Sequence, residues 1–181
     1  MAALEYAVAD HIATITLNRP ERMNTISREM LDELCVVLTR ANEDKDVRVI
    51  VLTGTGRAFC AGLDLNEAAS GEGIGGSGNK FSATLDLRNT PPTVLHAIDK
   101  PVIAALNGSA AGYGMDLALG CDIRIMAEEA KLAAAFVKRG VVPESGGTWF
   151  LPRMLGWAKA SEIIFTGRTL TAAECLAEGL A

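Results

Sequence analysis

Two short, nearly continuous apolar runs, each closed by a glycine-bearing turn, limit most strongly how this chain can fold. They cover residues 47–52 and 101–106. Runs of this length between turn residues are typical of buried strands. A helical signal at residues 113–119 and a further strand signal at 122–127 follow the second run. This alternation of strands and helices predicts an α/β architecture with crossover connections.

The rest of the chain supplies further elements. Residues 11–17 are rich in β-branched side chains and stop before Pro20, which cannot continue a strand ladder. Ser27 stands as the N-cap of a helix, whose apolar stripe comprises Met30, Leu31, Leu34, Val37 and Leu38. After Gly146 we expect helices broken at Gly156 and Gly167. A chain of 181 residues that is 49% hydrophobic is long enough for one globular domain with its own core.

Composition excludes several classes of partner. The net charge is -5 with acids and bases interspersed, so no basic stripe is available for a nucleic acid. No apolar run reaches the roughly 18 residues that a membrane span needs, and residues 1–10 do not resemble a secretory signal. The four cysteines are scattered with no C-x-x-C pair, which favours reduced thiols in a cytoplasmic protein. The sequence contains no set of ligand side chains expected to converge on one point, so we expect neither a metal nor a redox cofactor.

One low-complexity stretch covers residues 70–78 and is predicted to be a loop. It holds two literal G-x-G-x-x-G matches, at residues 71–76 and 73–78. A dinucleotide fingerprint must follow a strand and open a helix, whereas these matches follow Asn66-Glu67-Ala68-Ala69. We therefore expect no nucleotide site there.

Two glycine-flanked turns after apolar strands are the strongest candidates for chemistry. They lie in residues 57–65 and 107–116. Small residues let another group approach the backbone, and a turn can direct N–H groups outward. In the second turn these donors also lie at a helix N-terminus, which favours negative charge. Two such donors converging on one oxygen would form an oxyanion hole.

A series of motifs in this order resembles the crotonase (enoyl-CoA hydratase/isomerase) superfamily over nearly the whole chain. The motifs are LNRPERMN at 17–24, FCAGLDL at 59–65, KPVIAALNG at 100–108, CDIR at 121–124, GVVPESGG at 140–147 and FTG at 165–167. The resemblance implies a spiral of ββα units with a helical C-terminal region. It further implies a single domain over residues 1–181 that lacks its last helices, and a homotrimer or hexamer.

The resemblance also implies an acyl-CoA thioester as substrate, with coenzyme A as part of that substrate and no separate cofactor. It places the two oxyanion donors on the backbone N–H groups of Leu63 and Tyr113. The residues that it places along the bound thioester are Arg22, Met23, Ala61, Gly62, Asp64, Leu65, Asn66, Gly112 and Phe136. The resemblance places Arg22 and Met23 near the phosphate end of the coenzyme A path. Asp64 could equally cap a turn, and Arg22 could equally be a solvated surface base.

The carboxylates bear on which reaction the chain catalyses. Hydratases of this family generally use two glutamates, and the positions that match them are Asp116 and Phe136. Because phenylalanine cannot move a proton, the chain lacks the pair of carboxylates with which these hydratases activate water. Glu144 falls where some isomerases of the family carry their base. We therefore expect Glu144 and Asp116 as catalytic residues, although each lies where it could instead be an acid at a helix N-terminus.

Three functions follow from this pattern. The leading one is a lyase or isomerase that acts through a thioester enolate, with a double-bond shift weighed equally with hydration. The same oxyanion hole would also support thioester hydrolysis. The loss of a carboxylate at Phe136 favours a third function, a CoA-thioester-binding or assembly subunit without catalysis. His11, His96 and Cys60 are expected to be surface or packing residues.

Overall fold

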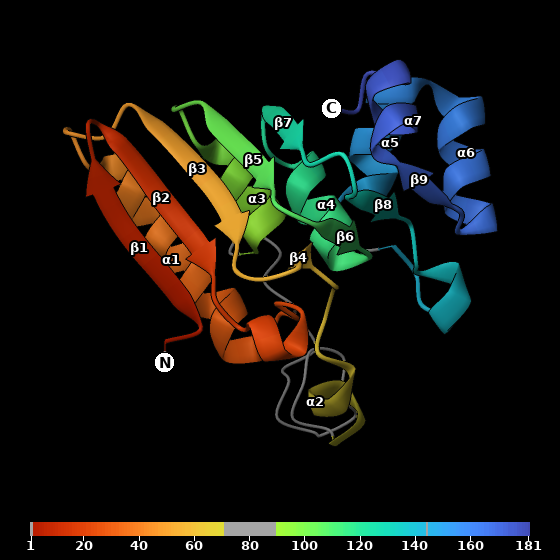
Figure 1. The fold of residues 1–181 in the computed structure, drawn as a ribbon, viewed down its shortest axis with the longest axis horizontal. Coiled ribbons are helices and arrows are strands. Elements are labelled where there is room, and N and C mark those ends of the chain that lie inside the picture. The colour runs from red at the N-terminus through yellow and green to blue at the C-terminus, as the bar shows by residue number, and fades with distance from the viewer. Residues whose placement is uncertain (1, 71–89, 144) are drawn as a thin grey trace.

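A computed structural model describes residues 2–70, 90–143 and 145–181 of the chain (Figure 1). The larger sheet has five strands in the order β1-β2-β3-β5-β7. Its strands are β1 (Leu4–Ala9), β2 (Ile12–Leu17), β3 (Val49–Gly54), β5 (Val102–Leu106) and β7 (Ile123–Met126). β1 and β2 form an antiparallel hairpin, and all other neighbours in this sheet are parallel.

A second sheet has four short strands in the order β4-β6-β8-β9. They are β4 (Ala58–Cys60), β6 (Ser109–Ala111), β8 (Lys131–Ala133) and β9 (Thr169–Thr171). β4, β6 and β8 run parallel, and β9 pairs antiparallel with β8.

The two sheets are joined by a repeating unit. β3, β5 and β7 each lie in the larger sheet, and each is followed by a short strand of the second sheet and then by a helix. The helices are α1 (Arg28–Glu43), α2 (Leu65–Ser70), α3 (Pro91–Ala97), α4 (Tyr113–Leu119), α5 (Gly147–Leu155), α6 (Trp157–Thr166) and α7 (Ala172–Ala177), with short 3-10 turns η1 (Pro20–Arg22) and η3 (Val137–Arg139). This order is the ββα repeat that the family resemblance implies. Figure 1 shows the C-terminal helices gathered at one end, beside the second sheet.

Local signals in the sequence account for the main elements. Ser27 caps α1 as predicted, because its side-chain oxygen accepts the Met30 N–H at 3.1 Å. β5 alternates between buried and partly exposed residues, so Val102, Ala104 and Leu106 face the core. α4 is buried along its whole length and lies at the centre of the molecule.

The expected strands and helices are present, with shifts of one or two residues at their ends. The first predicted strand begins at Ile12 rather than at His11, because Asp10 and His11 form the hairpin turn with φ of 49° and 66°. β1 and the short strands of the second sheet were not predicted. Most of the low-complexity stretch, with both G-x-G-x-x-G matches, lies outside the described residues. None of the helices in the described part of the chain has the length and apolar content to cross a membrane.

The close contact between α4 and β4 gives a first test of the fold. A Cβ atom on Gly114 would overlap the carbonyl oxygen of Cys60. We expect Gly114→Ala to lower the free energy of unfolding by about 2 kcal/mol, because overpacking outweighs the gain in helix propensity. Gly120→Ala is the matched control, since the nearest atom to its Cβ would be the end of the Leu95 side chain, at 3.1 Å, and the backbone oxygens of Asp116 and Leu117 would lie at an ordinary contact distance of 3.5 Å. Urea denaturation of both variants measures the difference, and equal stabilities would contradict the packing argument.

Candidate functional site

The parallel pairing of β4 with β6 brings the two glycine-flanked turns together. Ala58 pairs with Ser109 and Cys60 with Ala110, so both strands end at the same edge of the second sheet. The first turn leaves β4 at Ala61, and the second leaves β6 at Gly112. The carboxyl edge of parallel strands is where ligands bind in open α/β sheets.

At this edge the two turns touch through their backbones. Gly62 has φ of +106°, and a Cβ atom there would lie 3.0 Å from Ala111 O and 3.7 Å from Tyr113 N. Gly112 has φ of +52°, and its N–H donates to Ala133 O at 2.9 Å. Both conformations favour glycine. No side chain therefore separates the backbone of Gly62 from that of Tyr113.

The Leu63 N–H is oriented by a β-bridge. The Ile26 N–H donates to Gly62 O at 2.8 Å, and the Asp64 N–H donates to Ile26 O at 2.9 Å. This bridge uses the groups on either side of the Leu63 amide, so the Leu63 N–H is directed away from Ile26. The Tyr113 N–H lies in the first turn of α4 and is directed out of the N-terminal end of that helix.

Asp64 is buried under two arginines. Its Oδ2 accepts Arg19 Nη2 at 3.0 Å and Arg22 Nη1 at 3.2 Å, and its Oδ1 accepts the Asn66 N–H at 3.2 Å. Burial by itself would raise the pKa of this carboxyl group. The hydrogen bonds from Arg19, Asn66 and Arg22 outweigh burial, so the pKa of Asp64 is lowered. Asp64 is therefore an ionised anchor of the first turn, and the sequence did not show that Arg19 belongs to it.

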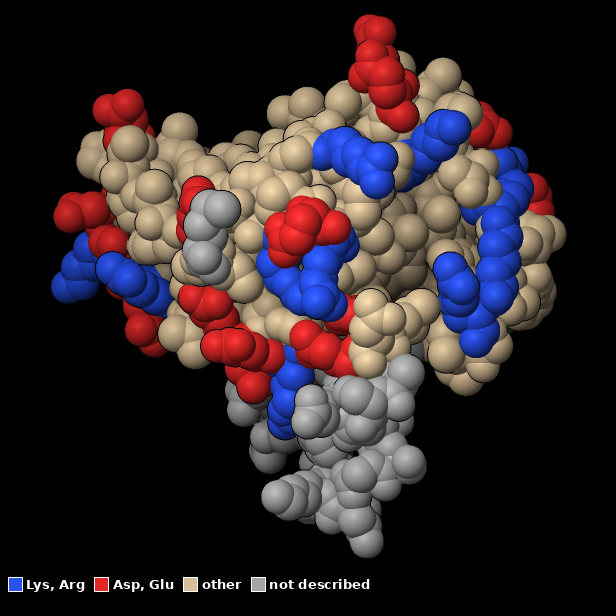
Figure 2. Space-filling model, turned by 60° about the horizontal axis from the view of Figure 1, so that its bottom comes forward, with Lys and Arg blue, Asp and Glu red and all other residues tan. Residues whose placement is uncertain are grey.

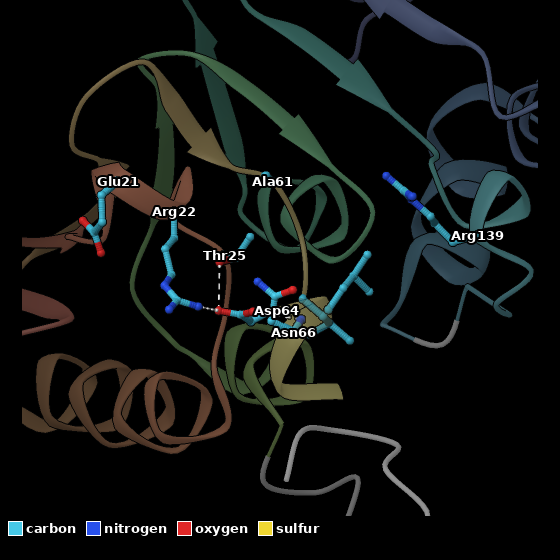
Figure 3. Close-up of a pocket in the computed structure, with 9 residues that line it drawn as sticks. Glu21, Arg22, Thr25, Ala61, Asp64, Asn66 and Arg139 are labelled. Atoms are coloured by element: carbon cyan, nitrogen blue, oxygen red, sulfur yellow. Dashed lines mark hydrogen bonds and ion pairs between the residues drawn. The ribbon is translucent and has the colours of Figure 1, made fainter. Parts of the chain in front are cut away.

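Beside this anchor lies a cavity of about 400 Å³ (Figure 3). It is lined by Glu21, Arg22, Thr25, Ala61, Leu63, Asp64, Leu65, Asn66 and Arg139. Arg22, Ala61, Asp64, Leu65 and Asn66 are residues that the family resemblance placed along the thioester, and Leu63 is one of the two expected oxyanion donors. The structure brings these six residues to one cavity. Figure 2 shows basic side chains on both sides of a recessed area of the surface turned forward.

Other predicted residues lie next to this cavity without lining it. The Met23 carbonyl oxygen accepts the Ala61 N–H at 3.0 Å, so Met23 supports the first turn from behind. Gly62, Gly112 and the buried Tyr113 form the contact between the turns.

Asp116 lies fully buried on α4, beside the N-terminus of α5. Its Oδ2 accepts the Ser145 hydroxyl at 2.6 Å. A Cβ atom on Gly147 would overlap Asp116 Oδ1, so glycine is needed where the carboxyl group packs against the start of α5. Asp116 thus holds the residue that follows Glu144 in the chain. Glu144 itself lies outside the described residues.

Phe136 lies against the second turn. It is 5% exposed, and a Cβ atom on Gly112 would lie 3.9 Å from Phe136 Cε1. The ring lines a second cavity of about 500 Å³, together with largely apolar residues of the η3 segment, α5 and α6. Phe136 therefore closes the side of the second turn with an apolar ring.

The remaining candidates are not reactive groups. Burial raises the pKa of the Cys60 thiol to about 12, and a backbone hydrogen bond with Gly62 offsets only part of this effect. His11 and His96 are exposed and lie away from the two turns, as expected. In the described ranges, no group of three or more His, Cys, Asp or Glu side chains is placed to hold a metal ion.

The model of the enoyl-CoA hydratase/isomerase family matches residues 8–181. The chain belongs to this family. It is 43% identical over 166 residues to the 1,2-epoxyphenylacetyl-CoA isomerase of Escherichia coli, covering 89% of this chain and 61% of that protein. It is 38% identical over 175 residues to the (E)-benzylidenesuccinyl-CoA hydratase of Thauera aromatica, covering 96% and 66%.

The family membership and the fold that the sequence predicted are confirmed. An enoyl-CoA hydratase of Bacillus anthracis has the same fold, with a TM-score of 0.85 and 37% identity over 99% of this chain and 69% of that one. The chain spans 61% to 66% of the length of the two curated relatives.

The buried charge of Asp64 predicts a pH-dependent stability for this member of the enoyl-CoA hydratase/isomerase family. We expect Asp64→Asn to lower the free energy of unfolding by about 2 kcal/mol at pH 7, because it removes a charge that is hydrogen-bonded to Arg19 and Arg22. A lowered folded-state pKa contributes stability that is complete above the unfolded value of about 3.9 and is lost as pH falls through the folded value. Urea denaturation of both proteins between pH 7 and pH 3 measures this. A gap that stays constant over that range would contradict the assignment.

Proposed function

We propose that this protein converts an acyl-CoA thioester by holding the thioester oxygen between the Leu63 and Tyr113 backbone N–H groups. The observation that carries the proposal is the contact between the two turns, where a Cβ atom on Gly62 would lie only 3.7 Å from Tyr113 N. Its support also includes the β-bridge that directs the Leu63 N–H and the position of Tyr113 in the first turn of α4. Family membership adds the class of substrate.

The proposed hole acts on charge that develops during the reaction. When a proton leaves the acyl chain, negative charge moves onto the thioester oxygen and an enolate forms. Two fixed donors stabilise this oxygen without reorganising, and one such donor contributes roughly 10²- to 10³-fold to the rate in enzymes of acyl transfer. Both donors belong to the main chain, so the side chains of Leu63 and Tyr113 do not affect the proposal.

The proton transfer is assigned to Glu144. This residue precedes Ser145, whose hydroxyl donates to buried Asp116, and it follows Pro143, which lines the same cavity as Phe136. Asp116 is proposed to hold this segment in place. The prediction that Asp116 itself moves a proton is tested with the Asp116→Asn variant. With Glu144 as the one carboxylate that transfers a proton, a double-bond shift is favoured over hydration. Phe136 stands in the place of the second carboxylate that would activate water.

The cavity beside Asp64 is proposed to take the coenzyme A arm on its Arg22 side. Its volume of about 400 Å³ is in the range of small-molecule sites. The half-exposed Arg22 lies at its edge and can meet a phosphate group, while Leu65 and Asn66 line the path from the first turn. Coenzyme A enters as part of the substrate, and the proposed step uses no further cofactor. The expected homotrimer or hexamer and the cytoplasmic location stay predictions.

Incubation of the full-length protein with 2-enoyl- and 3-enoyl-CoA thioesters in D2O tests the function. A double-bond shift with deuterium in the acyl chain and no added water is the expected result. Net addition of water would assign hydration instead, and release of free coenzyme A thiol would assign hydrolysis. Binding of the thioesters without any turnover would refute the catalytic proposal and leave the binding-subunit alternative, which Phe136 favours.

Two variants separate the roles of the carboxylates. Glu144→Gln is expected to lower kcat by about 10²- to 10⁴-fold with thioester affinity nearly unchanged, because it removes the proton acceptor and keeps the shape. Asp116→Asn is expected to lower kcat less and to lower stability, since it weakens the contact with Ser145. The exposed Glu128→Gln is the matched control. Steady-state kinetics and calorimetric binding measure both effects, and full activity of Glu144→Gln would sink the assignment of the base.

A further inference from the structure

Two adjacent basic residues of the η3 turn, Lys138 and Arg139, extend in different directions. Lys138 lies against the C-terminal end of α6, where its Cε would be 3.3 Å from a Cβ atom on Gly167. That position is favourable for a cation, because the C-terminal end of a helix carries partial negative charge. Arg139 extends the other way and lines the cavity beside Asp64 (Figure 3). The sequence pair Lys138-Arg139 contains no signal that distinguishes these two roles.

Arg139 brings a positive charge to this cavity without forming an ion pair with Glu21 or Asp64, the two acids that line it. Asp64 pairs with Arg19 and Arg22, at 3.0 and 3.2 Å. Arg139 takes part in none of the ion pairs formed between residues in the described ranges. A guanidinium group stays protonated at all ordinary pH values and presents several donors in one plane. The exposed Arg139 therefore offers a permanent positive charge to the contents of the cavity.

The location of Arg139 indicates which part of a bound thioester it faces. In Figure 3 Ala61 lies between Arg22 on one side and Arg139 on the other. The Arg139 N–H donates to Phe136 O at 2.9 Å, and Phe136 in turn lies against Gly112 of the second turn. Arg139 therefore lies across Ala61 from Arg22, on the side of Phe136 and the second turn.

We propose that Arg139 is a receptor for an anionic group carried by the bound thioester. This inference rests on the proposed function, because it assumes that the thioester oxygen lies between Leu63 and Tyr113. The group is an oxyanion that accepts hydrogen bonds from the guanidinium. Two sources supply it, a carboxylate on the acyl chain or a phosphate of coenzyme A. Its position on the Phe136 side favours the carboxylate, with the apolar part of the chain beside the ring.

The test compares Arg139→Gln with Lys138→Gln, which removes the neighbouring charge outside the cavity. Three ligands are used with each full-length protein: an enoyl-CoA with a neutral end, its analogue of the same length with a terminal carboxylate, and the neutral acyl group on pantetheine, which lacks the phosphates. Calorimetry gives Kd for each ligand, and kcat/KM is measured for those that turn over. Circular dichroism melting verifies that both variants are folded.

Loss of one charge-assisted contact is expected to weaken binding about tenfold or more. If Arg139→Gln weakens only the carboxylated thioester by this factor, the acyl chain is the source. If it weakens both CoA thioesters and spares the pantetheine thioester, a phosphate is the source. Equal effects of Arg139→Gln on all three ligands, or an effect of Lys138→Gln as large as that of Arg139→Gln, would overturn the proposal.

The failure of this inference is distinct from failure of the proposed function. An unmodified protein that converts enoyl-CoA thioesters while Arg139→Gln leaves every Kd unchanged retains the function and loses the receptor. An unmodified protein that binds the thioesters and converts none loses the function, and the Kd values still report on Arg139.

Discussion

The parallel contact between β4 and β6 is the constraint on which the candidate site depends. Each strand has only three residues, so little of the contact's stability comes from the strands alone. It relies on glycine backbone that lies against a neighbouring carbonyl group, at Gly114 beside Cys60 and at Gly62 beside Ala111. A larger residue at either position would move the two turns apart. The proposed hole is therefore a product of close backbone packing.

A second long-range interaction sets the direction of the first turn. Arg19 and Asp64 are 45 positions apart in the chain, and their ion pair is largely buried. Together with the Ile26–Leu63 bridge, it ties the segment after β2 to the segment after β4. A buried pair of this kind adds modestly to net stability, yet losing one partner is costly because the other charge is left in a poorly hydrated place. Its value here is that it allows one orientation of the Leu63 amide.

Elements with strong local signals were predictable, and those that depend on distant contacts were not. α1 was predicted from its Ser27 cap and apolar stripe, and α4 from the glycine-bearing turn before it, and all of these signals are local. β4, β6, β8 and β9 are too short to leave a pattern, and pairing with distant strands defines them. The two glycine turns were found from motifs. By contrast, the burial of Asp64 under Arg19 and the divergence of Lys138 from Arg139 depend on packing that no local sequence pattern encodes.

The proposed use of main-chain groups at Leu63 and Tyr113 has a consequence for how this site responds to mutation. A backbone amide is present whatever side chain the codon specifies, so substitution at these positions leaves the donors in place as long as the glycine contacts remain. The groups that would move protons or read the acyl chain are side chains, such as Glu144, Phe136 and Arg139. In the proposed mechanism, holding the thioester and choosing the reaction therefore depend on different parts of the residue, the main chain and the side chain. Side-chain substitutions could then change the reaction while the fold keeps the two proposed donors in place.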